Sequence, residues 1–199
     1  MPFIVAVTPN IPPASKDEFL GVWPSIKAEI AKQPGVLAVS GGEVVAEDAT
    51  PVTEFKFFQS IAFASAEDEK AFGESDWAKE HFKKAQEKSA GPPIIRKFQT
   101  GDFPASKPKA LTQFSFLELA DESKHEEAKQ AWLDLVAALG QESFGGRSAD
   151  DGPLTGLGVI GWDSKEQAQE AFSKPEVLAA AEKYKSLGKA ISIAVKLEA

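Results

Sequence analysis

Two histidines supply the only imidazoles of this chain, and it has no cysteine. His81 follows Trp77 by one helical turn and precedes Phe82, so on a helix it borders an apolar face. An imidazole at the edge of an apolar pocket can exchange protons near neutral pH. We therefore predict that His81 is a catalytic acid/base; the alternative is a boundary histidine bonded to backbone or to an acidic neighbour. His125 falls in a polar first helical turn, where we expect it to be exposed.

Aromatic side chains provide the candidate substrate-binding surface. The hypothesis places six of them around a hydrophobic, aromatic compound: Phe72 and Trp77 on helices, and Phe57, Phe114, Phe116 and Trp162 on strands. Small-molecule pockets are lined mainly by apolar and aromatic side chains. The alternative is ordinary core packing, because aromatic rings also bury large areas in protein interiors.

Several reaction classes lack the residues that they need. Without cysteine there are no disulfides, thiolate nucleophiles or cysteine-ligated metals. The sequence contains neither a Gly-x-x-x-x-Gly-Lys-Ser/Thr phosphate loop nor a nucleotide-binding fingerprint. It also lacks the spacings of a Ser-His-Asp triad, of paired catalytic carboxylates and of a histidine metal cluster. We therefore expect no metal and no cofactor.

The balance of charge narrows the range of partners. The chain has 30 acidic and 22 basic residues, which gives a formal net charge of −8. A phosphate backbone or an anionic membrane would repel such a surface, so we expect no nucleic acid and no membrane partner. Residues 1–7 lack a cationic region, and no apolar stretch reaches the roughly 18 to 20 residues that span a bilayer. We expect a cytoplasmic protein that binds a small hydrophobic molecule.

The elements that must position these residues occur twice along the chain. Phe63–Phe72 resembles Trp162–Phe172: each runs from an aromatic strand end through a serine cap and an acidic turn to Ala-Phe. The pair Gly41-Gly42 is likewise echoed by Gly145-Gly146, where we expect a strand bend or bulge. Such self-similarity predicts two copies of one structural unit.

Segment 104–109 separates the two copies. It contains two prolines and two lysines, which suits an exposed linker. We therefore predict a first module over residues 1–103 and a second module over residues 110–199.

Each module is predicted to run strand, helix, strand, strand, helix, strand. In the first module we predict strands over 3–8, 36–45, 54–63 and 94–100, a helix opened by the capping box Ser15-x-x-Glu18, a short helical turn capped by Ser65, and a helix over 76–88. Pro24 should kink or restart the first helix. In the second module we predict strands over 111–119, 142–148, 155–162 and 190–197, with helices over 122–139, 164–172 and 175–187.

Some of these strands are apolar at almost every position, as in 3–7 and 158–162. Such runs indicate strands buried on both faces. Two helices per module cover one face of a four-stranded sheet, so the other face must meet the second module. Eight strands closed into a barrel leave an interior that side chains fill or that holds one small ligand. We predict an α+β fold in which two ferredoxin-like modules form one pseudo-dimeric eight-stranded barrel. This pairing within one chain predicts a monomer, and a further homodimer stays open.

The order of elements and the repeat length resemble the dimeric α+β barrel superfamily, with its antibiotic-biosynthesis-monooxygenase-like branch the most similar, here as a fused tandem. The pattern covers nearly the whole chain, and the motif covers residues 72–83. Members of that branch often carry a His, two variable residues, Ser-Pro and a second His here. This chain keeps Ser75 and has Phe72 and Trp77 at the two histidine positions.

The same stretch is similar to the helix of bacterial haem-degrading monooxygenases, where a Trp precedes an Asn, Ser-Asp and, further on, an iron-ligating His. This chain retains Ser75-Asp76 and Lys79-Glu80, with His81 nearby. The resemblance implies haem binding through His81.

Three functions follow. The first is a small-molecule-binding barrel, a cofactor-independent monooxygenase, cyclase or isomerase in which His81 is the acid/base and Phe72 and Trp77 shape the pocket. The second is a non-catalytic binding or assembly module whose interior is filled by side chains, favoured by Phe and Trp at the family's histidine positions. The third is haem binding. The space inside the barrel distinguishes the first two.

Overall fold

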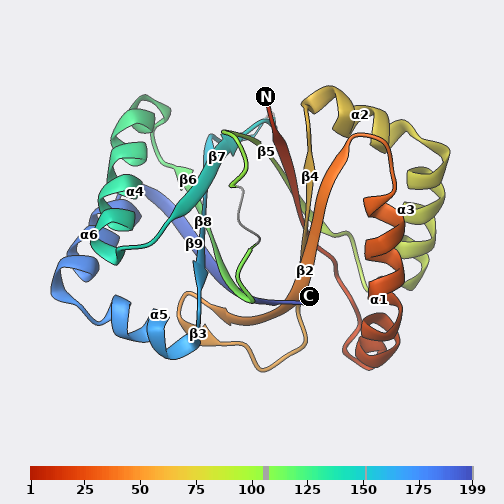
Figure 1. Ribbon diagram of the computed structural model, residues 1–199, viewed down its shortest axis with the longest axis horizontal. Coiled ribbons are helices and arrows are strands. Elements are labelled where there is room, and N and C mark those ends of the chain that lie inside the picture. The colour runs from red at the N-terminus through yellow and green to blue at the C-terminus, as the bar shows by residue number, and fades with distance from the viewer. Residues whose placement is uncertain (105–107, 151, 199) are drawn as a thin grey trace.

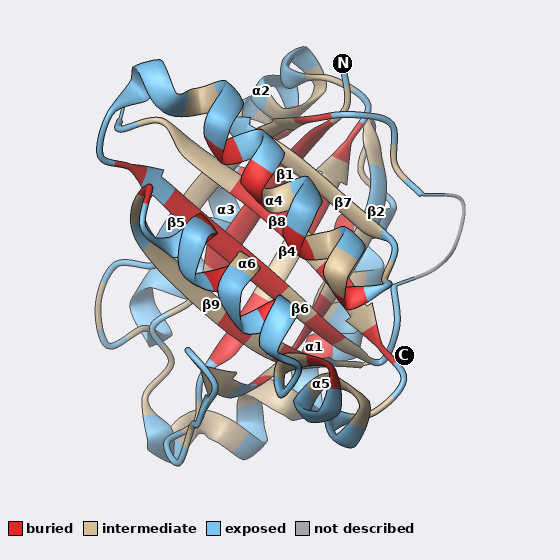
Figure 2. Cartoon of the chain, turned by 90° about the vertical axis from the view of Figure 1, so that its left-hand side faces the viewer, coloured by how far each residue is buried: buried red, intermediate tan, exposed pale blue. Residues whose placement is uncertain are grey.

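Strand β1 (Phe3–Thr8) shows how the sequence builds the molecule, because residues 3–7 are all buried. Ile4 and Ala6 point to the apolar cluster inside a barrel, whereas Phe3, Val5 and Val7 pack against helices outside it. The predicted burial on both faces is therefore confirmed. The computed structural model describes residues 1–104, 108–150 and 152–198, and Figure 2 shows the buried strands running beneath the helices.

The first half of the chain contributes four barrel strands and three α-helices. After β1 and a 3-10 turn (Pro13–Ser15) come α1 (Lys16–Ala31), β2 (Val36–Glu47), β3 (Thr50–Pro51), β4 (Phe57–Phe63), α2 (Ala66–Glu74), α3 (Asp76–Lys88) and β5 (Ile94–Thr100). The second half contains β6 (Leu111–Leu119), a 3-10 turn (Glu122–Lys124), α4 (His125–Leu139), β7 (Ser143–Ser148), β8 (Thr155–Trp162), α5 (Lys165–Phe172), α6 (Pro175–Lys185) and β9 (Gly188–Leu197).

The strands pair in the order β2-β4-β1-β5-β7-β8-β6-β9, and β9 pairs back with β2 to close an antiparallel barrel. The four strands of each half are adjacent and follow the same internal order, which is that of a ferredoxin-like unit. The two halves join edge to edge at β5–β7 and β2–β9. Helices α1–α3 lie on one side of the barrel and α4–α6 on the other (Figure 1). The predicted α+β barrel of two ferredoxin-like units is confirmed.

Several predicted elements coincide with the structure, and others differ. The bounds of β1, β5, β6, β8 and α3 are those predicted, whereas β4 begins only at Phe57 and β2 extends to Glu47. The short strand β3 was not predicted. Residues 105–107 of the predicted linker lie outside the described residues, so the module boundary stays a prediction.

The start of α1 corrects two predictions. Ser15 ends the 3-10 turn, and its side chain makes no capping hydrogen bond, so the predicted capping box is wrong. The turn leaves the helix to begin at Lys16. We predicted a kink or a restart at Pro24; α1 runs without a break through this exposed residue, so the restart is wrong and the kink stays a prediction. A proline that faces solvent loses one helical hydrogen bond without opening the core.

The interior of the barrel is filled by side chains. Phe58 on β4 meets Phe114 on β6 with 4.4 Å between ring centroids, and Phe98 on β5 lies 5.8 Å from Phe116 on β6. These strands are not neighbours in the sheet, so rings from opposite walls meet across the interior. Arg96 enters one end, its guanidinium 4.9 Å from the Phe116 ring centroid. Burial lowers the pKa of Arg96, and nearby Glu118 opposes that effect.

No helix in the described ranges is both long enough and apolar enough to cross a membrane.

Candidate functional site

Each half has an equivalent gap between its first helix and the sheet. In the first half, Gly41 on β2 pairs with Gln59 on β4, and Glu43 pairs with Phe57. In the second half, the corresponding Gly145 on β7 pairs with Gly158 on β8, and Arg147 pairs with Gly156. Phe57 and Gly156 are therefore equivalent positions. Along the helices, Phe19 and Ala128 each lie three residues beyond the first helical residue, and Trp23 and Trp132 each lie seven beyond it.

In the first half this gap is packed with aromatic rings. Phe57 is fully buried, with its ring centroid 4.8 Å from that of Phe19 and 4.9 Å from that of Trp23. The indole of Trp23 covers Gly41, where a Cβ would lie 2.3 Å from it. What remains is a hollow of about 260 Å³ beside α1, lined in part by Lys27.

In the second half the same gap is open. Ala128 stands in place of Phe19 and Gly156 in place of Phe57. Trp132 leans over Gly158, where a Cβ would lie 2.3 Å from its indole. The result is a cavity of about 420 Å³ between α4 and strands β7 and β8, bordered by Ala128, Trp132, Leu154 and Gly156. The two halves thus differ by two phenylalanine side chains, which fill the gap in the first half and have no counterpart in the second.

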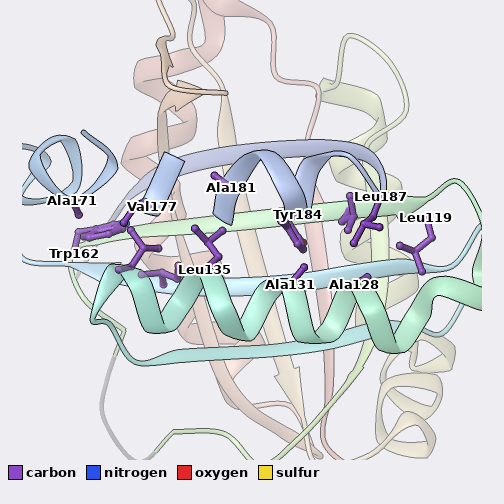
Figure 3. Packing of buried hydrophobic residues seen from close by; sticks show 13 residues of the cluster. Leu119, Ala128, Ala131, Leu135, Trp162, Ala171, Val177, Ala181, Tyr184 and Leu187 are labelled. Carbon is purple, nitrogen blue, oxygen red and sulfur yellow. The ribbon is translucent and has the colours of Figure 1, made fainter. Parts of the chain in front are cut away.

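Three residues with hydroxyl groups border the cavity: Thr100, Ser143 and Tyr184. Tyr184 on α6 is buried and points toward α4 (Figure 3), with its ring 5.4 Å from that of Trp132. Burial raises the pKa of Tyr184 to about 12, although a hydrogen bond with Ser115 acts in the opposite direction. Tyr184 is therefore protonated at neutral pH and suits a hydrogen-bond donor. Thr100 is 2% exposed, and its Oγ1 has no hydrogen-bond partner among the described residues.

Basic side chains border the same cavity. Arg147 of β7 and His125 and Lys129 of α4 all line it. The His125 side chain is 36% exposed, less than the sequence predicted, and its Nδ1 lies 3.2 Å from a carboxylate oxygen of Glu126. Lys129 lies 4.0 Å from Glu126, whose side chain is 80% exposed. The site therefore joins an apolar floor to a polar, basic border.

The structure brings together three of the predicted site residues, Phe72 on α2 and Trp77 and His81 on α3. These two helices lie on the side of the barrel opposite to α4 (Figure 1). Ring centroids are 5.9 Å apart for Phe72 and Trp77, and 4.9 Å apart for Trp77 and His81, whose rings stack at 8°. Burial lowers the pKa of His81, and Glu29 of α1 opposes this shift. His81 borders neither cavity described above.

The other predicted aromatic residues are separated from this group and from one another. Phe57 packs in the gap beneath α1, and Phe114 and Phe116 fill the barrel interior. Trp162 belongs to the cluster between the sheet and α4–α6, and its Nε1 donates to Oε1 of Gln113 at 3.2 Å. None of these four borders either cavity. Their roles in binding stay predictions.

The residues that open the cavity were missed from the sequence. Ala128, Trp132, Arg147, Gly156 and Tyr184 come from four different elements. A signal was nevertheless present in the repeat, since aligning the two copies sets a glycine against Phe57 and an alanine against Phe19.

A metal ion held by side chains alone needs several ligands close together. No three His, Asp or Glu side chains within the described ranges are grouped so as to hold a metal ion. Trp77 covers one face of the His81 ring, and neither of the two cavities described above adjoins that imidazole. Haem binding through His81 stays a prediction.

No protein-family model matches the sequence, and no curated protein matches it. Solved structures do share its fold. An anthrone oxidase-like protein superposes with a TM-score of 0.71 at 14% identity, over 100% of this chain and 91% of the other. A candidate monooxygenase from Fusobacterium nucleatum subsp. nucleatum gives 0.71 at 7% identity, over 98% and 92%. Another from Lactobacillus acidophilus gives 0.65 at 11% identity, over 98% and 93%. The chain thus has the dimeric α+β barrel fold, with both halves in one polypeptide.

Proposed function

We propose that this protein binds a small hydrophobic compound in the cavity between α4 and strands β7 and β8. The observation that carries the proposal is the asymmetry of the two halves, because one gap is closed by Phe19 and Phe57 and the other is left open by Ala128 and Gly156. An unfilled cavity destabilises a fold, since the atoms that line it lose packing partners. A volume of about 420 Å³ lies within the range of small-molecule sites.

Acid–base catalysis on the bound compound is the reaction that the lining residues support best. His125 provides an imidazole that can accept a proton, and the protonated Tyr184 provides a donor. Proton removal begins isomerisation and cyclisation, and it also prepares an aromatic compound for oxygenation. Two structures with this fold are named as candidate monooxygenases, which supports an oxygenase. A cyclase or an isomerase is supported only by the acid–base residues of the cavity.

His81 is the alternative acid/base, in a site on α3. Replacing it discriminates the two sites: His81→Ala should abolish turnover with the fold intact if the site lies on α3, whereas His125→Ala should do so if the site lies beneath α4. Loss of turnover in the first variant alone would overturn the assignment of the α4 cavity as the catalytic site.

A non-catalytic binding module is the second candidate. The packed barrel interior favours this candidate, because side chains such as the rings of Phe58 and Phe114 fill the space inside the barrel. Such a module would retain a ligand without converting it. Every barrel strand has two neighbours in the same chain, which supports the proposed monomer in either case.

The test compares the wild type with Gly156→Phe. Native mass spectrometry should show a single-chain mass with a retained small molecule for the wild type and a bare single chain for the variant. The neutral probe N-phenyl-1-naphthylamine, whose fluorescence rises in apolar surroundings, should bind the wild type and not the variant. Gly21→Phe adds the same side chain at an exposed position with nothing within 4 Å, and controls for the added ring. Equal probe binding by wild type and Gly156→Phe would refute the proposed site.

A further inference from the structure

The border of the α4 cavity is basic in a protein that is acidic as a whole. The chain carries a formal net charge of −8. Yet the charged side chains that border the cavity are Arg147 and Lys129, with the imidazole of His125 beside them, and no Asp or Glu of the described residues borders it. The local potential therefore has the opposite sign to that of the protein, which favours an anion at this position.

The repeat shows that Arg147 is a specific departure from the first half. Its equivalent is Glu43, since Glu43 pairs with Phe57 and Arg147 with Gly156. Glu43 is neutralised by Lys16, with 2.8 Å between Nζ and Oε2. Arg147 has neither an ion pair nor a side-chain hydrogen bond among the described residues. Beside the closed gap, the carboxylate of Glu43 is thus paired with Lys16. Beside the open gap, the guanidinium of Arg147 has no partner among the described residues.

The guanidinium is suited to one kind of partner. Its planar fork can donate two parallel hydrogen bonds to a carboxylate or to another oxyanion. Gly156 is its register partner on β8, so the backbone of Arg147 lies beside the glycine that opens the cavity, and Arg147 borders that cavity. The basic side chains of α4 cannot replace it fully, because Lys129 and the imidazole of His125 both lie near the carboxylate of Glu126.

The floor of the cavity sets the rest of the ligand. Leu117, Leu154 and Leu157 are apolar, Trp132 presents an indole, and Gly145 and Gly156 present bare backbone. Such a floor accommodates a flat apolar body. We infer that the ligand is an amphipathic organic anion, with its apolar or aromatic body beneath α4 and its anionic group held by Arg147 at the border. This inference rests on the proposed function, because it requires the ligand to occupy this cavity.

Two fluorescent probes test the inference. The anionic probe 8-anilinonaphthalene-1-sulfonate and the neutral N-phenyl-1-naphthylamine share one aromatic framework and differ by the sulfonate. Each should be titrated into the wild type, Arg147→Gln and Lys27→Gln. Lys27 lines the hollow of the first half and donates to the carbonyl oxygen of Glu198, so it is the matched control.

Arg147→Gln should weaken binding of the anionic probe about tenfold, since a charge-assisted hydrogen bond is lost, and should change binding of the neutral probe less than about twofold. Lys27→Gln should change neither, and added salt should weaken only the anionic probe. Equal effects of Arg147→Gln on both probes, or none on either, would overturn the inference.

Variants that close the cavity separate this inference from the proposed function. Gly156→Phe and, independently, Ala128→Phe should abolish binding of both probes. If both probes still bind these variants, the cavity is not the site and the proposed function fails with the inference. If Gly156→Phe and Ala128→Phe lose both probes while Arg147→Gln binds them like the wild type, the cavity does bind ligands. Only the inference that Arg147 holds an anionic group of the ligand is then refuted.

Discussion

Gly156→Phe should stabilise the protein while it abolishes ligand binding. The substitution copies Phe57 of the first half into the open gap of the second. A Cβ at Gly156 would meet only the carbonyl oxygen of Leu117, at 4.0 Å, so the ring can enter the cavity without displacing backbone. Gly145 and Gly146 offer no such room, because a Cβ there would lie 2.5 Å from the carbonyl oxygen of Leu157 and 2.4 Å from that of Gln99, respectively.

The expected gain follows from burial. Moving a phenylalanine side chain from water into an apolar cavity contributes about 1.5 to 3 kcal/mol, and removing a glycine from a strand adds about 0.5 to 1 kcal/mol. The free energy of unfolding should therefore rise by about 2 to 4 kcal/mol, which for a chain of this size corresponds to about 4 to 16 °C in Tm. Adding Ala128→Phe should recreate the edge-to-face pair of Phe19 and Phe57, worth about 0.5 to 1.5 kcal/mol more.

Urea denaturation followed by circular dichroism measures this gain, and titration with N-phenyl-1-naphthylamine measures the loss of binding. Gly21→Phe on α1 should change the free energy of unfolding by less than about 1 kcal/mol, because its side chain stays in solvent. A Gly156→Phe protein that is less stable than the wild type and still binds the probe would refute the reasoning. The cavity would then lack room for a phenylalanine ring, and the probe would bind elsewhere.

Three further predictions concern other contacts. Burial lowers the pKa of His81, so the folded state favours the neutral imidazole; the resulting stability is present above the ordinary pKa of 6.5 and is lost as the pH falls through 6.5 toward the lowered pKa. Between pH about 7.5 and about 5.5, the urea midpoint of His81→Gln should therefore fall less than that of the wild type. Parallel curves for the two proteins would contradict this. Tyr184→Phe removes a buried hydroxyl that can interact with Ser115 and should cost about 1 kcal/mol, measured by thermal unfolding; an unchanged Tm would be the contrary result. Asp48, with φ 45°, exchanges two 2.8 Å hydrogen bonds with the Ser192 backbone. Asp48→Ala should therefore cost about 1 to 3 kcal/mol and Asp48→Asn less, because Asn tolerates this backbone conformation; equal losses in the two variants would argue against the contact.

The elements that could be located from the sequence are those with strong local patterns. Strand β1 is apolar at every position from Phe3 to Val7, and its predicted bounds are those observed. Helix α3 begins after Ser75, whose Oγ accepts from the amide of Ala78, and a serine cap of this kind is a local signal. Ser15 failed as a capping box because the prolines before it favour a 3-10 turn, which a pattern of side chains alone does not distinguish.

The seven predicted site residues illustrate the limit of such reasoning. Phe57, Phe114 and Trp162 all fit an apolar strand pattern, yet they face three different clusters of the folded chain. Which face a strand residue occupies depends on pairing with strands far along the sequence. An aromatic residue therefore has the same appearance in the sequence whether it fills a core or borders a cavity.

The sequence by itself determined the architecture, through a repeated order of elements and strands that are apolar on both faces. A closed barrel with a layer of helices on each side buries both faces of these strands. What only the tertiary structure decided is where the molecule is hollow. Ala128 and Gly156 lie on a helix and a strand that meet only when the second half folds, and small residues are compatible with either tight packing or empty space. The difference depends on whether a neighbouring side chain fills the gap, as Phe57 does in the first half, and that is a property of three-dimensional packing.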